Sequence, residues 1–336
     1  MSRGMRAYGL ARVRVMRSRL VGRDRLPVLR GVQGARPYAQ ALEALGLDAA
    51  DPRGALAVLT GRLGDRLAHL SRIYPDAAAT FEALAGLQEI ENLKLGWRAL
   101  TRRLPTERWL PAWRPLGRAA RLAPEAFREA GSLHELPPRI ARTPYGEIAD
   151  TELRTHATDP EAAELAFDRF AGRRVVAALR ALPAHEALAR SLLEDLVRAR
   201  DLEIVGRTAR RGDLGAEAAV GLAAILGDEV RPAALRAFAE WTSADGPLAA
   251  RLPRVVLRHP EGIADPPALR RRLAARRRLA CTRAMRDGGF SLAPPIAYAL
   301  LAAGEVDALL ALVEAGMRED VGDALEPALL ASALGG

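Results

Sequence analysis

The stretch Glu89-Ile90-Glu91-Asn92-Leu93 decides how this chain is organised, because its pattern occurs twice more. The pattern is acidic, aliphatic, acidic, any residue, aliphatic, and the other copies are Asp201–Val205 and Glu305–Leu309. The starts of the three copies are separated by 112 and then 104 residues. Such near-equal spacing indicates a structural unit that is used three times. It favours an interaction scaffold over an enzyme.

The first copy shows the periodicity of an amphipathic helix. Apolar residues recur at steps of three and four, which places them on one helical face. They are Ile90, Leu93, Trp97, Leu100 and Leu104. We expect this face to be core. The second copy repeats the arrangement with Leu202, Val205 and Ala209, and the third with Val306, Leu309 and Val313.

A polar stripe runs beside the apolar face. In the first copy it contains Glu91, Lys94 and Arg98, at spacings that bring opposite charges together on successive turns. The second copy has Glu203 and Arg210, whereas the third has Glu314 in place of the arginine. We predict that the paired residues are partly buried and make charge-assisted hydrogen bonds to neighbouring helices. The alternative is an ordinary solvated edge.

Length and composition set the fold class. A chain of 336 residues exceeds one usual core, and units of about 110 residues fit the repeat. We place them at residues 1–107, 108–212 and 213–336. Aromatic residues make up only 4%, and alternating strand-like runs are missing, so we predict an all-α fold. Helices are expected near 5–21, 36–46, 52–70, 76–103, 124–131, 159–182, 184–211, 215–226, 231–243, 265–287, 294–303 and 305–317.

The chain is basic, with a net charge of +9 and a pI near 10.7. Lys94 is its only lysine, a bias that resembles a GC-rich coding background. Two arginine clusters lie near 12–19 and 270–278. Either could bind nucleic acid, an anionic lipid surface or an acidic protein, or simply be solvated. Because no aromatic residues are interleaved to stack bases, nucleic-acid binding is the weaker interpretation.

Motifs that carry catalysis or bind metals and phosphates are missing. The five histidines are scattered, and no zinc, phosphate-loop or dinucleotide signature is present. We therefore predict no catalytic residue, cofactor or metal. Cys281 lies among arginines that could activate a thiol, but we favour a buried core residue. One cysteine excludes an intramolecular disulfide, and an intracellular location follows.

The N-terminal segment allows two interpretations. Residues 1–23 carry many arginines and no acid, as in an organellar transit peptide, but their periodicity also suits a first structural helix, which we prefer. No transmembrane segment is expected, because no stretch approaches the ~20 apolar residues that span a bilayer. The longest candidates, 216–226 and 294–303, are interpreted as buried helices.

Five segments resemble one known family. They are Tyr8–Leu20, Glu89–Arg98, Arg198–Val205, Pro294–Leu301 and Glu305–Leu309. Together they look like the C-type subunit of the prokaryotic V/A-type ATPase, whose eukaryotic equivalent is the d-type subunit. The resemblance runs through all three units. It departs from the family pattern where Ile204 and Ala308 replace the asparagine that the first copy keeps as Asn92.

The resemblance implies a fold and a function. The fold would be three helical bundles around a pseudo-threefold axis, forming a funnel without catalytic activity. The funnel would sit on the membrane rotor ring, receive the lower end of the central D/F shaft, and so be cytoplasmic and peripheral to the inner membrane. We take this central-stalk adaptor as the leading hypothesis. A basic helical protein that binds nucleic acid and a scaffold unrelated to ATPases are the alternatives.

The candidate contacts with a partner are cationic. They are Arg12, Arg14, Arg270, Arg271, Arg276 and Arg277, and we expect them to meet acidic residues on the shaft or ring. A removable shaft suits a funnel with a polar, charged lining, because non-obligate interfaces keep a surface-like polarity.

Overall fold

The computed structural model describes residues 3–18, 20, 43, 46–48, 50–148, 160–209 and 266–316. Within these ranges the side chains of 3, 52, 160–162, 198, 201–209, 266–272 and 311–316 are outside the description. Every regular element of the described chain is an α-helix or a 3-10 helix, and none is a strand. The prediction of an all-α fold is therefore confirmed.

Six long helices and α1 form the body of the molecule. They are α1 (Arg3–Arg17), α4 (Pro52–Ile73), α5 (Ala78–Thr101), α10 (Pro160–Ala181), α11 (Ala187–Ala209), α16 (Pro266–Asp287) and α17 (Ala293–Gly316). Short elements follow α5 in the chain. They are α6 (Thr106–Trp109), η2 (Leu110–Ala112), η3 (Gly117–Ala119), α7 (Glu125–Arg128), η4 (Leu133–Glu135) and α8 (Leu136–Ile140), and η1 (Pro75–Ala77) precedes α5.

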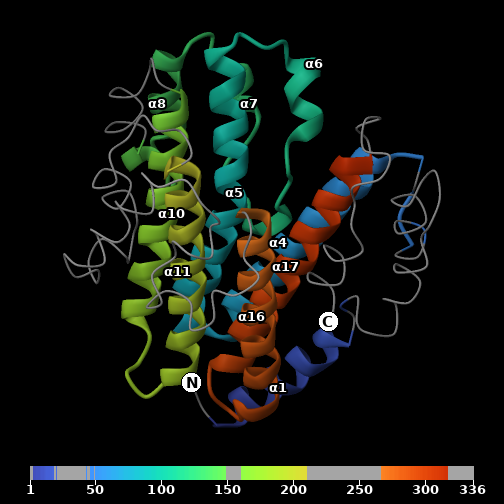
Figure 1. The fold of residues 1–336 in the computed structure, drawn as a ribbon, viewed down its shortest axis with the longest axis vertical. Coiled ribbons are helices and arrows are strands. Elements are labelled where there is room, and N and C mark those ends of the chain that lie inside the picture. The colour runs from blue at the N-terminus through green and yellow to red at the C-terminus, as the bar shows by residue number, and fades with distance from the viewer. Residues whose placement is uncertain are drawn as a thin grey trace.

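The long helices pack laterally, as Figure 1 shows. Helix α10 packs against both α5 and α11, and α4 packs against α5. Helices α16 and α17 form a second pair, with α16 against α11 and α17 against α4. Helix α1 lies across the base and contacts α17. The three copies of the repeated pattern thus lie on α5, α11 and α17.

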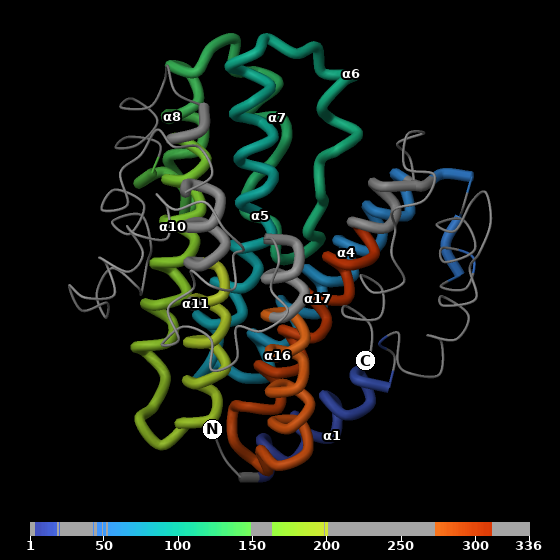
Figure 2. Tube along the Cα trace, in the orientation of Figure 1, coloured from blue at the N-terminus to red at the C-terminus, as the bar shows by residue number. Residues whose placement is uncertain are grey.

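The chain reverses at the base of the molecule in two tight connections, which can be followed in Figure 2. One joins α10 to α11 and the other joins α16 to α17. In the second, Gly289 has a φ of 54°, in the left-handed region that glycine adopts without strain. Helix starts follow their sequence signals: Pro52 opens α4, and the Asp51 side chain accepts a hydrogen bond from the Gly54 N–H at 2.9 Å.

The predicted core face of α5 is confirmed for three of its five residues, whereas Leu100 and Leu104 are half-buried and Leu104 follows the end of the helix. Ile90, Leu93 and Trp97 are fully buried, and the Trp97 ring packs edge-on against Phe167 of α10 with centroids 5.8 Å apart. In α17 the equivalent Val306 and Leu309 are also buried. In these two copies the apolar positions therefore face one core, whereas the side chains of Leu202, Val205, Ala209 and Val313 lie outside the described residues.

Two glycines let the segment after α5 lie directly on the helices. A Cβ on Gly64 of α4 would lie 1.8 Å from the backbone oxygen of Leu116, and one on Gly96 of α5 would lie 2.2 Å from the Phe127 ring. Neither position has room for a side chain. The segment around 104–115, predicted to separate the first unit from the second, packs closely on α5. The unit boundaries themselves stay predictions.

Helix α17 corrects one prediction. We expected separate helices over 294–303 and 305–317, but one helix continues through Gly304. A helical glycine costs only about 1 kcal/mol relative to alanine, which buried neighbours offset. The window Ala293–Leu310 is long and apolar enough to cross a membrane, contrary to expectation, but 72% of it is buried inside the protein. It serves here as a core helix.

The other predicted helices agree with the structure within a few residues where they are described. The helices expected over 215–226 and 231–243, and most of 36–46, lie outside the described residues. Helix α1 matches the structural interpretation of the N-terminal segment, and its residues Leu10 and Val13 are buried.

Candidate functional site

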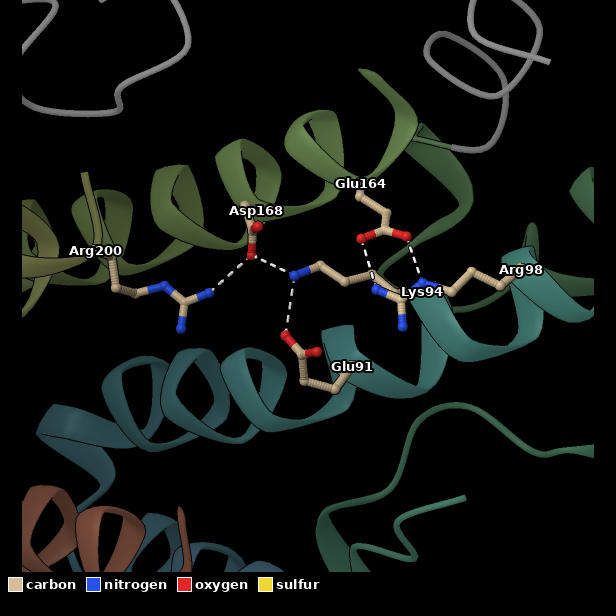
Figure 3. Close-up of polar contacts among 6 residues, drawn as sticks. All are labelled: Glu91, Lys94, Arg98, Glu164, Asp168 and Arg200. Carbon is tan, nitrogen blue, oxygen red and sulfur yellow. Dashed lines mark hydrogen bonds and ion pairs between the residues drawn. The ribbon is translucent and has the colours of Figure 1, made fainter. Parts of the chain in front are cut away.

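A buried ion pair joins α5 to α10 at the centre of the described molecule. The Lys94 ammonium donates to Asp168 at 2.7 Å, and the two side chains are only 4% and 2% exposed. Lys94 also donates to Glu91 on the preceding turn at 3.0 Å. Figure 3 shows the ammonium lying between the two carboxylates. This buried ammonium belongs to the only lysine of the chain, a compact point charge on a flexible stem.

Two arginines extend this cluster. Arg98 donates through Nε and Nη2 to both carboxylate oxygens of Glu164, and the Nη2 distance is 2.6 Å. This fork raises the pKa of Arg98. Arg200 of α11 donates to Asp168 at 3.0 Å. The six residues of Figure 3, which we call the central charged network, therefore connect three helices: α5, α10 and α11.

The structure brings only part of the predicted stripe together. Glu91, Lys94 and Arg98 belong to the network, whereas the side chain of Glu203 and the whole of Arg210 lie outside the described residues. Sequence reasoning missed Glu164, Asp168 and Arg200. Asp168 had one detectable signal: it directly follows Phe167 in an apolar stretch of α10, and an acid on an apolar face needs a buried partner.

Glu89, the first acid of the pattern, holds the chain that follows α5. One carboxylate oxygen accepts the backbone N–H groups of Arg121 and Leu122 at 2.6 and 2.7 Å, and the other accepts the Tyr145 hydroxyl at 2.9 Å. Burial raises the pKa of Glu89, against the opposing effect of these hydrogen bonds. Burial also raises the pKa of Tyr145, and the neighbouring Glu89 adds to the effect.

Asn92 binds the same connection one turn further on. Its amide group donates to the carbonyl of Arg114 at 2.7 Å, and its amide oxygen accepts the Arg114 N–H at 2.8 Å. Both backbone groups of one loop residue are thus satisfied by one side chain. In the first copy, the polar residues of the pattern have structural tasks.

Glu186 plays a comparable part at the base. Its buried carboxylate accepts the Leu292 N–H just before α17 at 2.8 Å and the Arg6 guanidinium of α1 at 3.3 Å. A carboxylate at a helix N-terminus also interacts favourably with the helix dipole. One side chain therefore fastens α1, the α10–α11 connection and the start of α17.

Asp307, the second acid of the third copy, is surrounded by groups from four elements, and we call these surroundings the recess. Its side chain is exposed, yet desolvation is the largest effect on its carboxyl and raises its pKa. The exposure and the desolvation are compatible if solvent reaches the carboxyl from one side while protein groups surround it on the others. Arg277, Arg114 and Arg200 lower the pKa in opposition, as does a hydrogen bond with Gln88. These groups come from α16, the loop after α5, α11 and α5, so all three predicted units contribute.

The predicted partner contacts lie on two helices. Arg12 and Arg14 are exposed on α1, and the Arg12 guanidinium donates to the Tyr8 hydroxyl at 2.6 Å. On α16, Arg276 is exposed and pairs with Asp195 at 3.2 Å, whereas Arg277 is half-buried toward Asp307. Arg270 and Arg271 also belong to α16, but their side chains are not described.

Cys281 is a core residue, as predicted. It is fully buried, and burial raises the pKa of its thiol to about 12 despite the nearby Arg277. The described part of the chain contains no cluster of three histidine, cysteine or acidic side chains arranged to hold a metal ion.

Comparison with known families gives one match. The family model vATP-synt_AC39, described as the ATP synthase (C/AC39) subunit, matches residues 10–319. The match includes all three copies of the pattern and the central charged network. No curated protein matches the chain.

Proposed function

The chain belongs to the ATP synthase (C/AC39) subunit family, and from this premise we propose that it is the non-catalytic central-stalk adaptor of a rotary V/A-type ATPase. Membership confirms the resemblance to the C-type subunit and indicates a role in ion transport and ATP synthesis. In the proposed role, the chain receives the central D/F shaft and rests on the membrane rotor ring. It would then be peripheral to the inner membrane on its cytoplasmic side.

The family match over residues 10–319 carries this proposal. The recess at Asp307 supports it, because a shaft end needs a concave surface to which every unit contributes. A transmitter of torque must also resist deformation. Laterally packed helices joined by the central charged network would meet that need.

The polarity of the recess supports a separable shaft. Arg114 and Arg277 stand near Asp307, so the charges around the recess are mostly positive. Acidic groups on a shaft would be attracted to such a surface, and a polar interface can be released more readily than an apolar one. The three units around a pseudo-threefold axis remain part of the proposal.

The test is binding of the purified full chain to its cognate D/F shaft complex and to the detergent-solubilised ring, at low and high salt. We expect it to retain both, with weaker retention of the shaft at high salt. The charge reversals Arg14→Glu and Arg276→Glu should slow association, since peripheral charges act mainly by steering. Leu279→Gln, an exposed and uncharged change on α16, is the matched control.

Two results would overturn the proposal. One is failure to bind either partner, together with tight, salt-sensitive binding to DNA, which would support the nucleic-acid alternative. The other is binding to an unrelated protein with no affinity for shaft or ring, which would support the general scaffold.

A further inference from the structure

A cavity of about 390 Å³ lies on a different face of α5 from the central charged network. It is formed by the end of α4, the start of α5, the segment around Arg118 to Arg121, Tyr145 and Arg174 of α10. Within α5, Glu82 lines the cavity and Glu91 belongs to the network. They are separated by about two and a half helical turns, which places them on opposite sides of the helix. Its volume is in the range of ~300–1,000 Å³ that small-molecule sites occupy.

Four arginines line this cavity: Arg72, Arg118, Arg121 and Arg174. Among the described residues, none of their guanidinium groups forms an ion pair with a carboxylate. Arg72 contacts the His69 ring at 3.3 Å, and Arg174 lies over the Phe170 ring. The four positive charges are therefore available to an anion.

The acids of the cavity do not cancel this charge. Glu82 and Glu89 line it, but both carboxylate oxygens of Glu89 already accept hydrogen bonds, from the backbone N–H groups of Arg121 and Leu122 and from the Tyr145 hydroxyl. Four guanidinium groups against two carboxylates leave an excess of positive charge. The Ser71 hydroxyl, also in the lining, offers a further hydrogen-bond donor.

The arginines act from two sides. Burial lowers the pKa of His69, and the positive charges of Arg12, Arg72 and Arg118 lower it further. On the other side of the cavity, Arg121 and Arg174 lower the pKa of Tyr145. Burial and the neighbouring Glu89 raise that pKa by more. Positive charge thus faces the cavity from both its α4 side and its α10 side.

Gly86 of α5 lines the cavity with its backbone, because it has no side chain. A Cβ there would lie 3.6 Å from the Tyr145 hydroxyl oxygen and 3.9 Å from Nη1 of Arg174. Arg174 therefore reaches from α10 across to the backbone of α5. Apolar walls from Leu67 and Phe81 complete an enclosure with a few polar groups, as ligand sites commonly have.

We propose that this cavity binds a phosphate-bearing small anion through Arg72, Arg118, Arg121 and Arg174. Several guanidinium groups around one space match the several oxygens and the multiple charge of a phosphate better than a single carboxylate. A free phosphate compound and the headgroup of an anionic phospholipid share this chemistry. The proposal does not depend on the proposed function, because it rests on the cavity alone.

The experiment uses the full chain and measures binding of inorganic phosphate and pyrophosphate by calorimetry, with chloride keeping the ionic strength constant. Sedimentation with vesicles of phosphatidylglycerol and phosphatidylcholine, against phosphatidylcholine alone, tests the lipid source. The variants are Arg72→Gln with Arg118→Gln, and separately Arg121→Gln; all three side chains are exposed. The matched control is Arg62→Gln with Arg128→Gln, which removes two exposed arginines outside the cavity.

We expect saturable binding of phosphate or pyrophosphate, weakened about tenfold for each cavity arginine removed and unchanged in the control. Binding only to the anionic vesicles, with the same dependence on the variants, would identify the lipid headgroup as the source. Absence of binding to all probes overturns the proposal. Equal losses in the cavity variants and the control overturn it too, because only net charge would then matter.

Discussion

Helices α5 and α17 carry the first and third copies of one pattern, and they use it differently. Their apolar positions agree, since Ile90 and Leu93 in α5 and Val306 and Leu309 in α17 are all buried. The pattern's aliphatic residues therefore set how each helix packs, in both places. They do not set what the helix does with its polar face.

The polar positions separate the two helices. In α5, Glu89 and Asn92 bind the backbone of the following segment, and Lys94 is buried against Asp168. In α17, Ala308 replaces the asparagine, and Asp307 remains exposed in its recess. The difference teaches that a repeated helix can use its polar residues for its own fold or keep them for a partner.

The largest expected effect is at the centre of the network. Asp168→Ala leaves the buried Lys94 ammonium and Arg200 without this carboxylate, and we expect a loss of about 3–5 kcal/mol in the free energy of unfolding. Urea denaturation at pH 7 measures it. Asp307→Ala removes a carboxylate from the polar face of α17 instead, and it should change the stability by less than about 1 kcal/mol. Equal costs at the two positions would break the comparison.

Glu89 should show the next largest effect. Glu89→Ala leaves two backbone N–H groups and the Tyr145 hydroxyl without an acceptor, so we expect a loss of about 2–4 kcal/mol. In Glu89→Gln the amide oxygen can still accept both N–H groups, and the loss should stay near ~1 kcal/mol. Thermal unfolding of the two variants compares them. Unchanged stability of Glu89→Ala would show that Glu89 does not hold the segment after α5.

Asn92→Ala should destabilise the protein by about 1–2 kcal/mol, because both backbone groups of Arg114 lose their partner. Asn92→Asp is the graded control, since it keeps an acceptor for the Arg114 N–H and loses the donor. Hydrogen exchange at Arg114 should accelerate in both variants, and more in the alanine variant. If the Arg114 amide exchanges at the same rate in both variants, Asn92 does not hold this loop.

The smallest effect concerns Asp307 and pH. Its carboxyl pKa is raised above the ordinary 3.8, so the folded chain holds this proton more tightly than the unfolded chain. Stability should therefore fall as pH rises from 3.8 through the raised pKa, and Asp307→Asn should remove that fall. Because solvent reaches the group, the difference should be well under ~1 kcal/mol. Urea denaturation across pH 3–7 measures it, and parallel profiles would contradict a desolvating recess.

Much of the fold could be predicted from the sequence because helical periodicity is local. Steps of three and four residues predicted the core face of α5, and proline and glycine signals placed most described helices within a few residues. The predicted helix break at Gly304 was wrong. A glycine costs a helix only about 1 kcal/mol, and the burial of the rest of α17, which local spacing does not show, offsets that cost. The family resemblance, carried by short segments in each unit, was likewise available from the sequence.

Less of the candidate site could be predicted from the sequence. The stripe residues Glu91, Lys94 and Arg98 could be named, but their partners could not. Lys94 and Asp168 are 74 residues apart, and Arg98 and Glu164 are 66 apart, so their pairing depends on how α10 packs against α5. The arginines of the cavity likewise come from separate elements that only the fold brings together.

By itself, the sequence determined that this chain is helical, which faces its helices bury and to which family it belongs. These properties follow from side-chain character and short-range spacing. The tertiary structure alone decided which charges pair, that Glu89 and Asn92 fasten a loop, and that Asp307 lies in a recess. A polar group finds its partner through long-range packing, which local periodicity does not encode.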